Sequence, residues 1–359
     1  MSEMYKKEVP LYDELLSIVA EVDNQVASDP LPPRHRIERH GDIRLGTPRE
    51  MQIMARLFAL FNMFPVGYYD LSLVGFPLHA TAFRPLTSDA LARNPFRVFT
   101  SLLRLDLLPD ETSTLAQKVL SKRNLFSDRL MELLGQAKTT GLATPEHEAE
   151  LLEESLKIFR WHATTHTPYD SYVQMKAVHP MIADIACFPK SRKPCSSAEC
   201  RLRIELRAPP RRACDILLRQ TSFKAFEERV QFVNDNGEVT VSHHTARFGE
   251  VEQRGAAVTR KERELYDTLL ERADSIAGAN VGSNDRWQKV LQDAFTPYPD
   301  TWAELRSQGL VFFRYRPVNK ASTPLSGEVC KLSELLANGL VEYEPITYED
   351  FLPISAAGI

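Results

Sequence analysis

The stretch PVGYYDLSLVGFPLHATAFRP (Pro65–Pro85) carries the signals that decide the fold of this chain. Its first half is aromatic and β-rich, which predicts a strand, and it leads into a segment with a histidine and an arginine five residues apart. His79 has the side chain of a metal ligand, and Arg84 suits an anionic substrate. A hydrogen-bonded histidine and a surface charge explain the same residues, so the stretch alone leaves both interpretations open.

Strand and helix signals extend from this stretch in both directions. Upstream, Thr47 and Glu50 have the residue types of an N-cap and a capping-box acid, with a proline between them, so they predict a helix start after a short strand. Downstream, residues 112–161 show three amphipathic helical segments with breaks near Asn124 and residues 139–144. The other predicted helices are residues 11–26, residues 259–275 and a short one in the C-terminal third. The predicted strands are residues 40–47, 66–75, 95–108, 182–188, 216–233, 239–253 and 310–317, with NDNGE at 234–238 as a hairpin turn.

The order of these elements predicts an α+β fold. An antiparallel β-sheet or partial barrel would carry a helical insertion at about residues 110–165. An N-terminal helical segment, residues 1–38, ends in a proline-rich break. The sequence contains no internal repeat, and its length alone suggests about two to three domains.

Composition argues against several classes of partner. The chain has 359 residues, 43% of them hydrophobic, and a net charge of −4, without a block of like charge for nucleic acid or a membrane surface. It has neither a long apolar run nor a signal-peptide start, so we expect a cytoplasmic protein; a mitochondrial address stays open, although the acidic N-terminal region is a poor transit peptide. Five cysteines, an odd number, argue against a disulfide framework, and Cys195 and Cys200 lack the second pair that a structural zinc site needs.

A second group of chemically active residues lies at 211–223 and 243–255. If the later segment is a strand, Phe248, Glu250 and Glu252 share one face of it, because strand side chains alternate. Two histidines and one carboxylate are the ligand set of a non-haem iron(II) site with open positions, and zinc or manganese accepts the same atoms. A salt-bridged strand on a solvated face is the alternative. No signature of a nucleophilic hydrolase occurs.

Seven blocks of the sequence resemble one family. They are the opening stretch, PFRVFTSLLRLDLL, FRWH, ADIACF, PPRRACDILLRQTSFKAFEE, HTARFGEVEQRG and YEDFLPISAAGI. Together they are similar to the 2-oxoadipate dioxygenase/decarboxylases, also called hydroxyglutarate synthases, which are related to the vicinal-oxygen-chelate superfamily. The resemblance runs from about Tyr12 to the last residue, so it implies that residues 1–359 form a single unit of this family.

This resemblance implies an antiparallel sheet or partial barrel of the vicinal-oxygen-chelate type, an Fe(2+) cofactor, and O2 and a 2-oxo dicarboxylic acid as substrates. In the family, 2-oxoadipate is converted to 2-hydroxyglutarate and CO2 in lysine degradation. A 2-oxo acid chelates iron through its keto oxygen and carboxylate, so the protein has mainly to hold geometry and exclude water.

The resemblance also implies roles for individual residues. His79 matches the first metal-binding histidine, and Arg84 matches an arginine suited to a two-point grip on a substrate carboxylate. Glu250 is the expected metal carboxylate, and Glu252 is the alternative. Ile354 and Ser355 match a segment whose backbone would meet the substrate. Arg219, Gln220 and Ser222 are further candidates for lining the pocket. His40, Tyr68 and Tyr69 are candidates for supporting the ligands, and buried tyrosines with ordinary hydrogen bonds are the alternative.

The chain departs from the family at its second metal-binding histidine. The family has this histidine after ADIxCF, whereas here residues 189–208 are atypical and no histidine lies between His179 and His243. Three explanations stay open: a mistranslated segment in the gene model, a site rebuilt with His179, His243 or His244, or a degenerate member that binds a 2-oxo acid or a partner without turnover. We favour the first. The chain also stops at SAAGI, where family members continue, so we expect a truncated C-terminus.

Overall fold

The computed structural model describes residues 40–139, 144–160, 164–188, 201–202, 209–277, 284–318 and 331–348, together with residues 4, 17–18, 20–22 and 24–25. Within these ranges, the side chains at 219–228 and 244–252, among others, fall outside the description. The chain divides into two compact units. Unit 1 comprises residues 1–203, 222–249 and 351–359, and unit 2 comprises residues 204–221 and 250–350.

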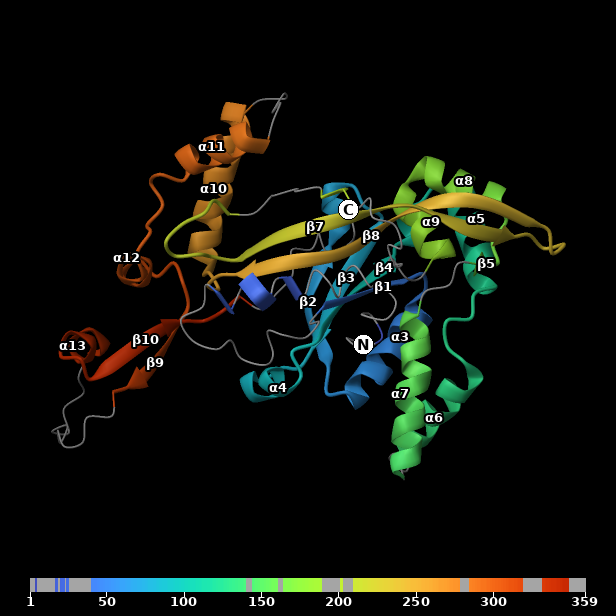
Figure 1. Cartoon of the computed structure of the whole chain (residues 1–359), viewed down its shortest axis with the longest axis horizontal. Helices are drawn as coiled ribbons and strands as arrows, with labels where there is room; N and C mark the ends of the chain where they lie inside the picture. The colour runs from blue at the N-terminus through green and yellow to red at the C-terminus, as the bar shows by residue number, and fades with distance from the viewer. Residues whose placement is uncertain are drawn as a thin grey trace. The chain divides into compact units, whose positions relative to one another are not determined.

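A four-stranded sheet organises unit 1 (Figure 1). Its strands are β1 (His40–Leu45), β2 (Phe64–Asp70), β3 (Leu78–Arg84) and β4 (Arg97–Leu103), in the order β1-β4-β3-β2. β1 runs parallel to β4, and the other neighbours are antiparallel. The strands predicted at 40–47, 66–75 and 95–108 are confirmed, and the second half of the opening stretch forms β3.

Two of these strands end earlier than predicted, because short 3-10 turns take their last residues. Asp70 ends β2: its carboxylate accepts hydrogen bonds from the Ser72 backbone N–H at 3.0 Å and from the Ser72 hydroxyl at 2.5 Å, which starts the turn Leu71–Val74. A second turn, Leu105–Leu107, follows β4. An aspartate that caps the turn after it stops a strand even where the apolar pattern continues.

Helices cover both faces of the sheet (Figure 1). The helices of unit 1 are α3 (Pro48–Leu60), α4 (Ser88–Arg93), α5 (Asp110–Ser121), α6 (Asp128–Thr139), α7 (Pro145–Phe159), α8 (Tyr169–Val178) and α9 (Pro180–Cys187). One apolar cluster joins α3, α6 and α7 to the face that carries Phe83. A second cluster joins α5, α8 and α9 to the face that carries Ala82. Adjacent residues of β3 serve different layers because strand side chains alternate.

The start of α3 and the helical insertion agree with the sequence. The Thr47 hydroxyl accepts from the Glu50 N–H at 3.2 Å, and the Glu50 carboxylate accepts from the Thr47 N–H at 3.1 Å, so the predicted capping box is present. The predicted insertion forms the three helices α5, α6 and α7, with breaks where they were expected.

The apolar segment at 182–188, predicted as a strand, is instead the helix α9, so that prediction was wrong. His179 caps this helix, since its Nδ1 accepts from the Met181 N–H at 3.1 Å, and Pro180 occupies the first turn. Most of the helix is buried. A short helix that is apolar on nearly all sides lacks a one-sided stripe, so its sequence looks like that of a buried strand.

A long hairpin of β7 (Leu218–Val233) and β8 (Val239–Arg254) contributes residues to both units. Its turn at 234–238 confirms the NDNGE signal. Asn234 Oδ1 accepts from two backbone N–H groups of the turn, and Gly237 has a φ of 82° that suits glycine. The short strands beside β7 are β5 (Thr164–Thr165) and β6 (Arg201–Leu202).

Unit 2 has its own apolar core, centred on Tyr266 and Phe295. Its elements are α10 (Arg260–Ala277), α11 (Asn284–Ala294), α12 (Trp302–Ser307), β9 (Phe313–Pro317), α13 (Leu332–Ala337) and β10 (Val341–Pro345). The helices α10 and α11 lie side by side, and β9 and β10 form an antiparallel ribbon (Figure 1). The helix predicted at 259–275 and the short helix of the C-terminal third are confirmed, whereas the strand predicted at 310–317 begins only at Phe313.

The mixed α+β class is confirmed, but the barrel is not found. The strands of the described ranges form small open sheets, and no closed barrel occurs among them. In the same ranges, no helix has the length and apolar character needed to cross a membrane. The predicted helix at 11–26 and the atypical segment 189–208 fall largely outside the described residues, although those described between 17 and 25 are helical.

Candidate functional site

His79 is the predicted site residue that the structure defines most fully. It is the second residue of β3, lies opposite Asp70 on β2 and Leu102 on β4, and is partly buried. Burial lowers the pKa of His79, and the charge of Arg104 lowers it further against the opposing charges of Asp70 and Asp106. These effects favour the neutral ring near pH 7, which is the form that binds a metal ion.

Tyr68 contacts this histidine directly. Its hydroxyl lies 3.3 Å from His79 Nδ1, and the two rings meet edge to face with centroids 5.7 Å apart. The contact is made at Nδ1, the ring nitrogen that a histidine ligand bound through Nε2 uses for its supporting hydrogen bond.

Arg104 places a cation on the same face of the sheet. Because His79 pairs with Leu102, Arg104 is the diagonal neighbour of His79, two residues further along the chain. Its backbone N–H bonds the Pro77 carbonyl at 2.8 Å and so continues the ladder. Its guanidinium holds Asp106 through two bonds, Nε to Oδ1 at 2.8 Å and Nη2 to Oδ2 at 2.6 Å. The Asp106 side chain is 62% exposed, so this grip on a carboxylate lies at the surface.

Arg84 does not share that face. It lies five residues after His79 on one strand, and an odd separation directs the two side chains to opposite faces of the sheet. Their Cα atoms are about 16 Å apart at the usual rise of a strand. Arg84 Nη1 donates to the Pro85 carbonyl at 2.9 Å. The structure therefore does not bring the predicted metal ligand and the predicted carboxylate clamp together.

Several predicted residues lie on the long hairpin, where only the backbone is described. They are Arg219, Gln220 and Ser222 on β7 and His244, Glu250 and Glu252 on β8. β8 is continuous through its three residues. The predicted roles of Ile354 and Ser355 also stay predictions, because both residues lie outside the described ranges.

The other histidines considered for the site have different surroundings. His179 caps α9, and its ring packs edge to face against Phe76 with centroids 5.2 Å apart. His243 is exposed on β8. His40 begins β1, where only its backbone is described. His179 therefore has a structural role that the sequence did not reveal, because the N-cap function became visible only once α9 was known to be a helix.

The His, Cys, Asp and Glu side chains show how well the described part of the chain could bind a metal ion. Among the side chains described, no group of three His, Cys, Asp or Glu residues could hold a metal ion. His79 by itself fits a ligand, since its ring is held at one nitrogen. Cys187 and Cys214 are buried free thiols, and burial raises the pKa of Cys187 to about 12, so its reactive thiolate is disfavoured.

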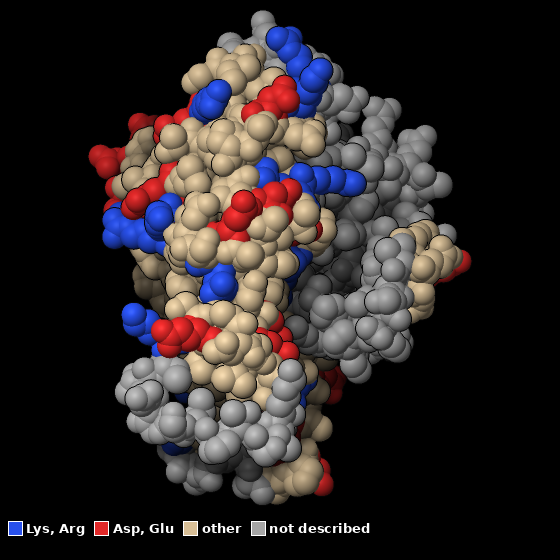
Figure 2. Space-filling model, turned by 90° about the vertical axis from the view of Figure 1, so that its left-hand side faces the viewer, with Lys and Arg blue, Asp and Glu red and all other residues tan. Residues whose placement is uncertain are grey.

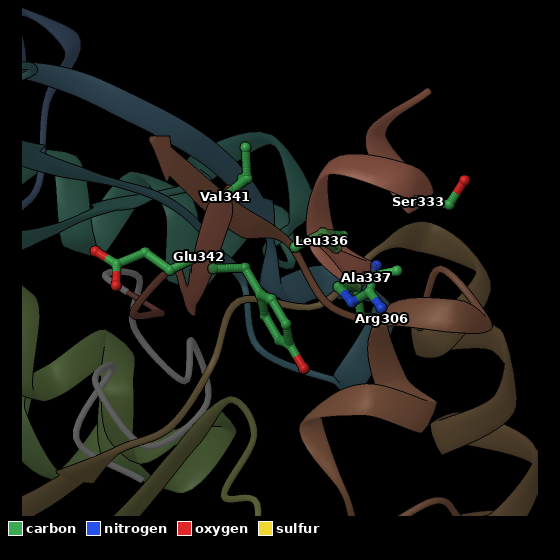
Figure 3. Close-up of a pocket in the computed structure, with 7 residues that line it drawn as sticks. Arg306, Ser333, Leu336, Ala337, Val341 and Glu342 are labelled. Carbon is green, nitrogen blue, oxygen red and sulfur yellow. The ribbon is translucent and has the colours of Figure 1, made fainter. Parts of the chain in front are cut away.

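A separate pocket of about 440 Å³ lies in unit 2 among α12, α13 and β10 (Figure 3). The residues that line it are Arg306, Ser333, Leu336, Ala337, Val341, Glu342 and Tyr343. The Arg306 guanidinium lies over the Tyr343 ring at 4.7 Å, and no predicted site residue lines the pocket. We therefore do not assign the chemistry to it. Among the described residues on the face that Figure 2 shows, basic and acidic side chains are interspersed, without a field of one sign that would steer a polyanion.

Comparison with known proteins assigns a family. A family model described as 2-oxoadipate dioxygenase/decarboxylase matches residues 1–192 and 195–359. The 2-oxoadipate dioxygenase/decarboxylase of Escherichia coli K12 is 42% identical over 389 residues, which cover the whole chain and 85% of the relative. The protein of the same name from Pseudomonas putida is 41% identical over 392 residues, which cover the whole chain and 84% of the relative.

Solved structures agree with this similarity. The hydroxyglutarate synthase of Pseudomonas putida in complex with 2-oxoadipate has a TM-score of 0.86 at 40% identity, and the match covers 100% of this chain and 86% of that chain. An uncharacterized protein of Shigella flexneri has a TM-score of 0.85 at 40% identity, with 99% and 89% covered.

The match to the family model has one interruption. The family model is interrupted at residues 193–194, within 189–208, and the alignment to the Escherichia coli protein is longer than this chain, so that relative has positions that this chain lacks. The resemblance predicted from seven blocks is thus confirmed over the full length, and this chain belongs to the 2-oxoadipate dioxygenase/decarboxylase family.

Proposed function

We propose that this chain is a 2-oxoadipate dioxygenase/decarboxylase, which converts 2-oxoadipate and O2 to 2-hydroxyglutarate and CO2 in lysine degradation. One observation carries the proposal: the whole chain is 42% identical to the Escherichia coli protein of that name. The structural likeness to a hydroxyglutarate synthase bound to 2-oxoadipate supports it. The two products contain together all the atoms of 2-oxoadipate and O2, so the reaction needs no further reductant.

We assign Fe(2+) to His79 and Glu250, with Glu252 as the alternative carboxylate. When bound, the metal would chelate the 2-oxo acid and activate O2. The support from this chain is the ring of His79, which is held at Nδ1 by Tyr68 and favoured in its neutral form. The support for Glu250 is the family match and its place on β8.

The substrate has two carboxylates, and one of them needs a cation besides the metal. Arg84 is the family match, whereas Arg104 lies on the face of His79 and already grips a carboxylate. Arg84→Met and Arg104→Met separate the two. Loss of the cation that binds the substrate should raise KM for 2-oxoadipate about 10- to 100-fold, because this factor corresponds to the free energy of one charged hydrogen bond. A rise in KM confined to one variant would exclude the other arginine from this role.

The missing second histidine favours one alternative function. Unless His244 replaces it, a site with one histidine and one glutamate binds iron weakly, because each lost ligand removes both affinity and geometry. The alternative is a protein that binds a 2-oxo acid or a partner without turnover.

Anaerobic Fe(2+) titration of the purified chain, with and without 2-oxoadipate, decides between the two functions. We expect one iron per chain, O2 uptake matched by 2-hydroxyglutarate, and loss of both in His79→Ala and Glu250→Ala. His166→Ala is the matched control, because His166 is exposed and not a candidate ligand. Binding of 2-oxoadipate without iron or turnover would replace the enzyme by the non-catalytic alternative. Iron binding that survives in His79→Ala would overturn the ligand assignment.

A further inference from the structure

We propose that Tyr68 is a positioning residue for His79: its hydroxyl holds Nδ1 of the imidazole and so directs Nε2 toward the metal ion. This inference rests on the proposed function, because it takes His79 as a metal ligand. Three observations support it. β2 has a bulge, Tyr68 contacts His79, and Asp70, which lies opposite His79, is hydrogen-bonded to Ser72 instead.

A β-bulge places Tyr68 beside the histidine. The register of β2 against β3 shifts between Val66 and Tyr69, so Gly67 and Tyr68 together face the single residue Thr81. Gly67 has a φ of 71°, which glycine adopts without strain, and the Thr81 hydroxyl donates to the Gly67 carbonyl at 2.9 Å. Bulges of this kind re-aim a side chain next to a functional group.

The bulge leaves Tyr68 as the partner of the ring. Asp70 lies directly opposite His79, and Tyr68, two residues earlier, is on the same side of β2. The Asp70 carboxylate is bound to the backbone and the hydroxyl of Ser72, where it caps the following turn. The hydroxyl that reaches His79 Nδ1, at 3.3 Å, is that of Tyr68.

The chemistry of a histidine ligand explains why such a partner matters. A ring that binds a metal through Nε2 carries its proton on Nδ1, and this proton needs an acceptor, which sets the tautomer and the ring orientation. The Tyr68 oxygen is placed to accept it. Tyr68 is 65% exposed as a residue, so its contribution to the apolar core is small. Removal of its hydroxyl should therefore affect the metal site more than the fold.

The test is Tyr68→Phe in the full chain, which removes the hydroxyl and keeps the ring. Tyr315→Phe is the matched control, because Tyr315 lies on β9 of unit 2, where its ring packs against Tyr343 with centroids 6.4 Å apart. The readouts are anaerobic Fe(2+) affinity, the tautomer of His79 in the metal-free protein by proton–nitrogen NMR, and the unfolding temperature. We expect Tyr68→Phe to lower the affinity about 10- to 100-fold and to mix the tautomers, with the unfolding temperature unchanged. Tyr315→Phe should leave the affinity and the tautomer as in the wild type.

Wild-type affinity and a wild-type tautomer in Tyr68→Phe would overturn the inference. Failure of the proposed function gives a different pattern, because the wild type and His79→Ala would then bind iron equally or not at all. The His79 tautomer still decides in that case. A tautomer that changes in Tyr68→Phe supports the hydrogen bond of Tyr68 to Nδ1, and an unchanged tautomer overturns the inference.

Discussion

Glu262, in the first turn of α10, carries a carboxyl group without exposed surface. Its Oε1 accepts from the Tyr298 hydroxyl at 2.7 Å, while Oε2 has no hydrogen-bond partner among the described atoms. Burial raises the pKa of Glu262 to about 7, against the lowering effects of the Tyr298 hydroxyl and Arg263. The folded protein therefore keeps this acid protonated at mildly acidic pH, where an ordinary glutamate is ionised.

A pH-dependent loss of stability should follow at this residue. The stability that the raised pKa supplies is complete below pH 4.5, the ordinary value, and is lost as the pH rises through 7. In Glu262→Gln this titration is absent, so the wild type should lose about 2 kcal/mol of unfolding free energy relative to the variant between pH 5 and pH 8. Urea unfolding at both pH values measures the difference. Glu264→Gln, exposed on the same helix, is the control, and parallel pH profiles for Glu262→Gln and the wild type would contradict the prediction.

At the scale of elements, a buried ion pair joins α3 to the end of α5 and to α9. Arg123 donates to Glu50 Oε1 through Nε at 3.0 Å and Nη2 at 2.7 Å, and through Nη1 to the Ile185 carbonyl at 2.5 Å. Both side chains of the pair are 10% exposed. Glu50 also accepts from the Gly46 N–H at 2.7 Å. The capping acid that the sequence identified thus has a second, tertiary role.

Removal of either partner should be costly, because the other charge stays buried without compensation. We expect Glu50→Gln and Arg123→Met each to lower the unfolding free energy by about 3–5 kcal/mol, and the double variant to cost less than the sum. Denaturant unfolding measures the three values. Arg260→Gln, from an exposed pair with Glu264, should cost less than about 1 kcal/mol, and strict additivity at the buried pair would argue against the coupling.

The bulge of β2 gives a second prediction at this scale. A Cβ on Gly67 would lie 2.9 Å from the Tyr69 hydroxyl, at a φ of 71°. We expect Gly67→Ala to cost about 1–2 kcal/mol of unfolding free energy and to weaken Fe(2+) binding by displacing Tyr68. Gly135→Ala, within α6 and with no atom within 4 Å of the new Cβ, should instead stabilise the chain by about 0.5–1 kcal/mol and leave iron binding unchanged. If Gly67→Ala changed neither the unfolding free energy nor the Fe(2+) affinity, the prediction of a strained geometry at this position would be refuted.

At the scale of the whole molecule, the apolar residues of the two compact units form separate clusters. Phe295 has no exposed surface in unit 2, and Phe83 is 1% exposed in unit 1. Phe295→Ala should cost about 3–5 kcal/mol through the cavity it leaves. In Phe295→Ala, we expect backbone amides to lose protection from hydrogen exchange mainly in α10 and α11. In Phe83→Ala, we expect the loss of protection mainly in β3 and β4. Equal losses throughout the chain for both variants would contradict separate cores.

Local signals explain which elements could be predicted. The capping box at Thr47 and the turn at 234–238 depend on residues within four positions of one another, so the sequence shows them directly. The helix α9 could not be predicted, because its burial on nearly all sides removes the periodicity that distinguishes a helix from a strand. The early end of β2 depends on the Asp70 side chain, which overrides a continuing apolar pattern.

The sequence by itself determined the family and singled out His79, because long blocks of specific residues identify a common ancestor without any knowledge of contacts. Only the tertiary structure decided which groups meet at that histidine. The bulge of β2 brings Tyr68 to it, the register of β4 places Arg104 beside it, and the alternation of β3 turns Arg84 away. The physical reason is that spacing along the chain defines neighbours within a strand, whereas backbone hydrogen bonding between strands defines the neighbours across a sheet.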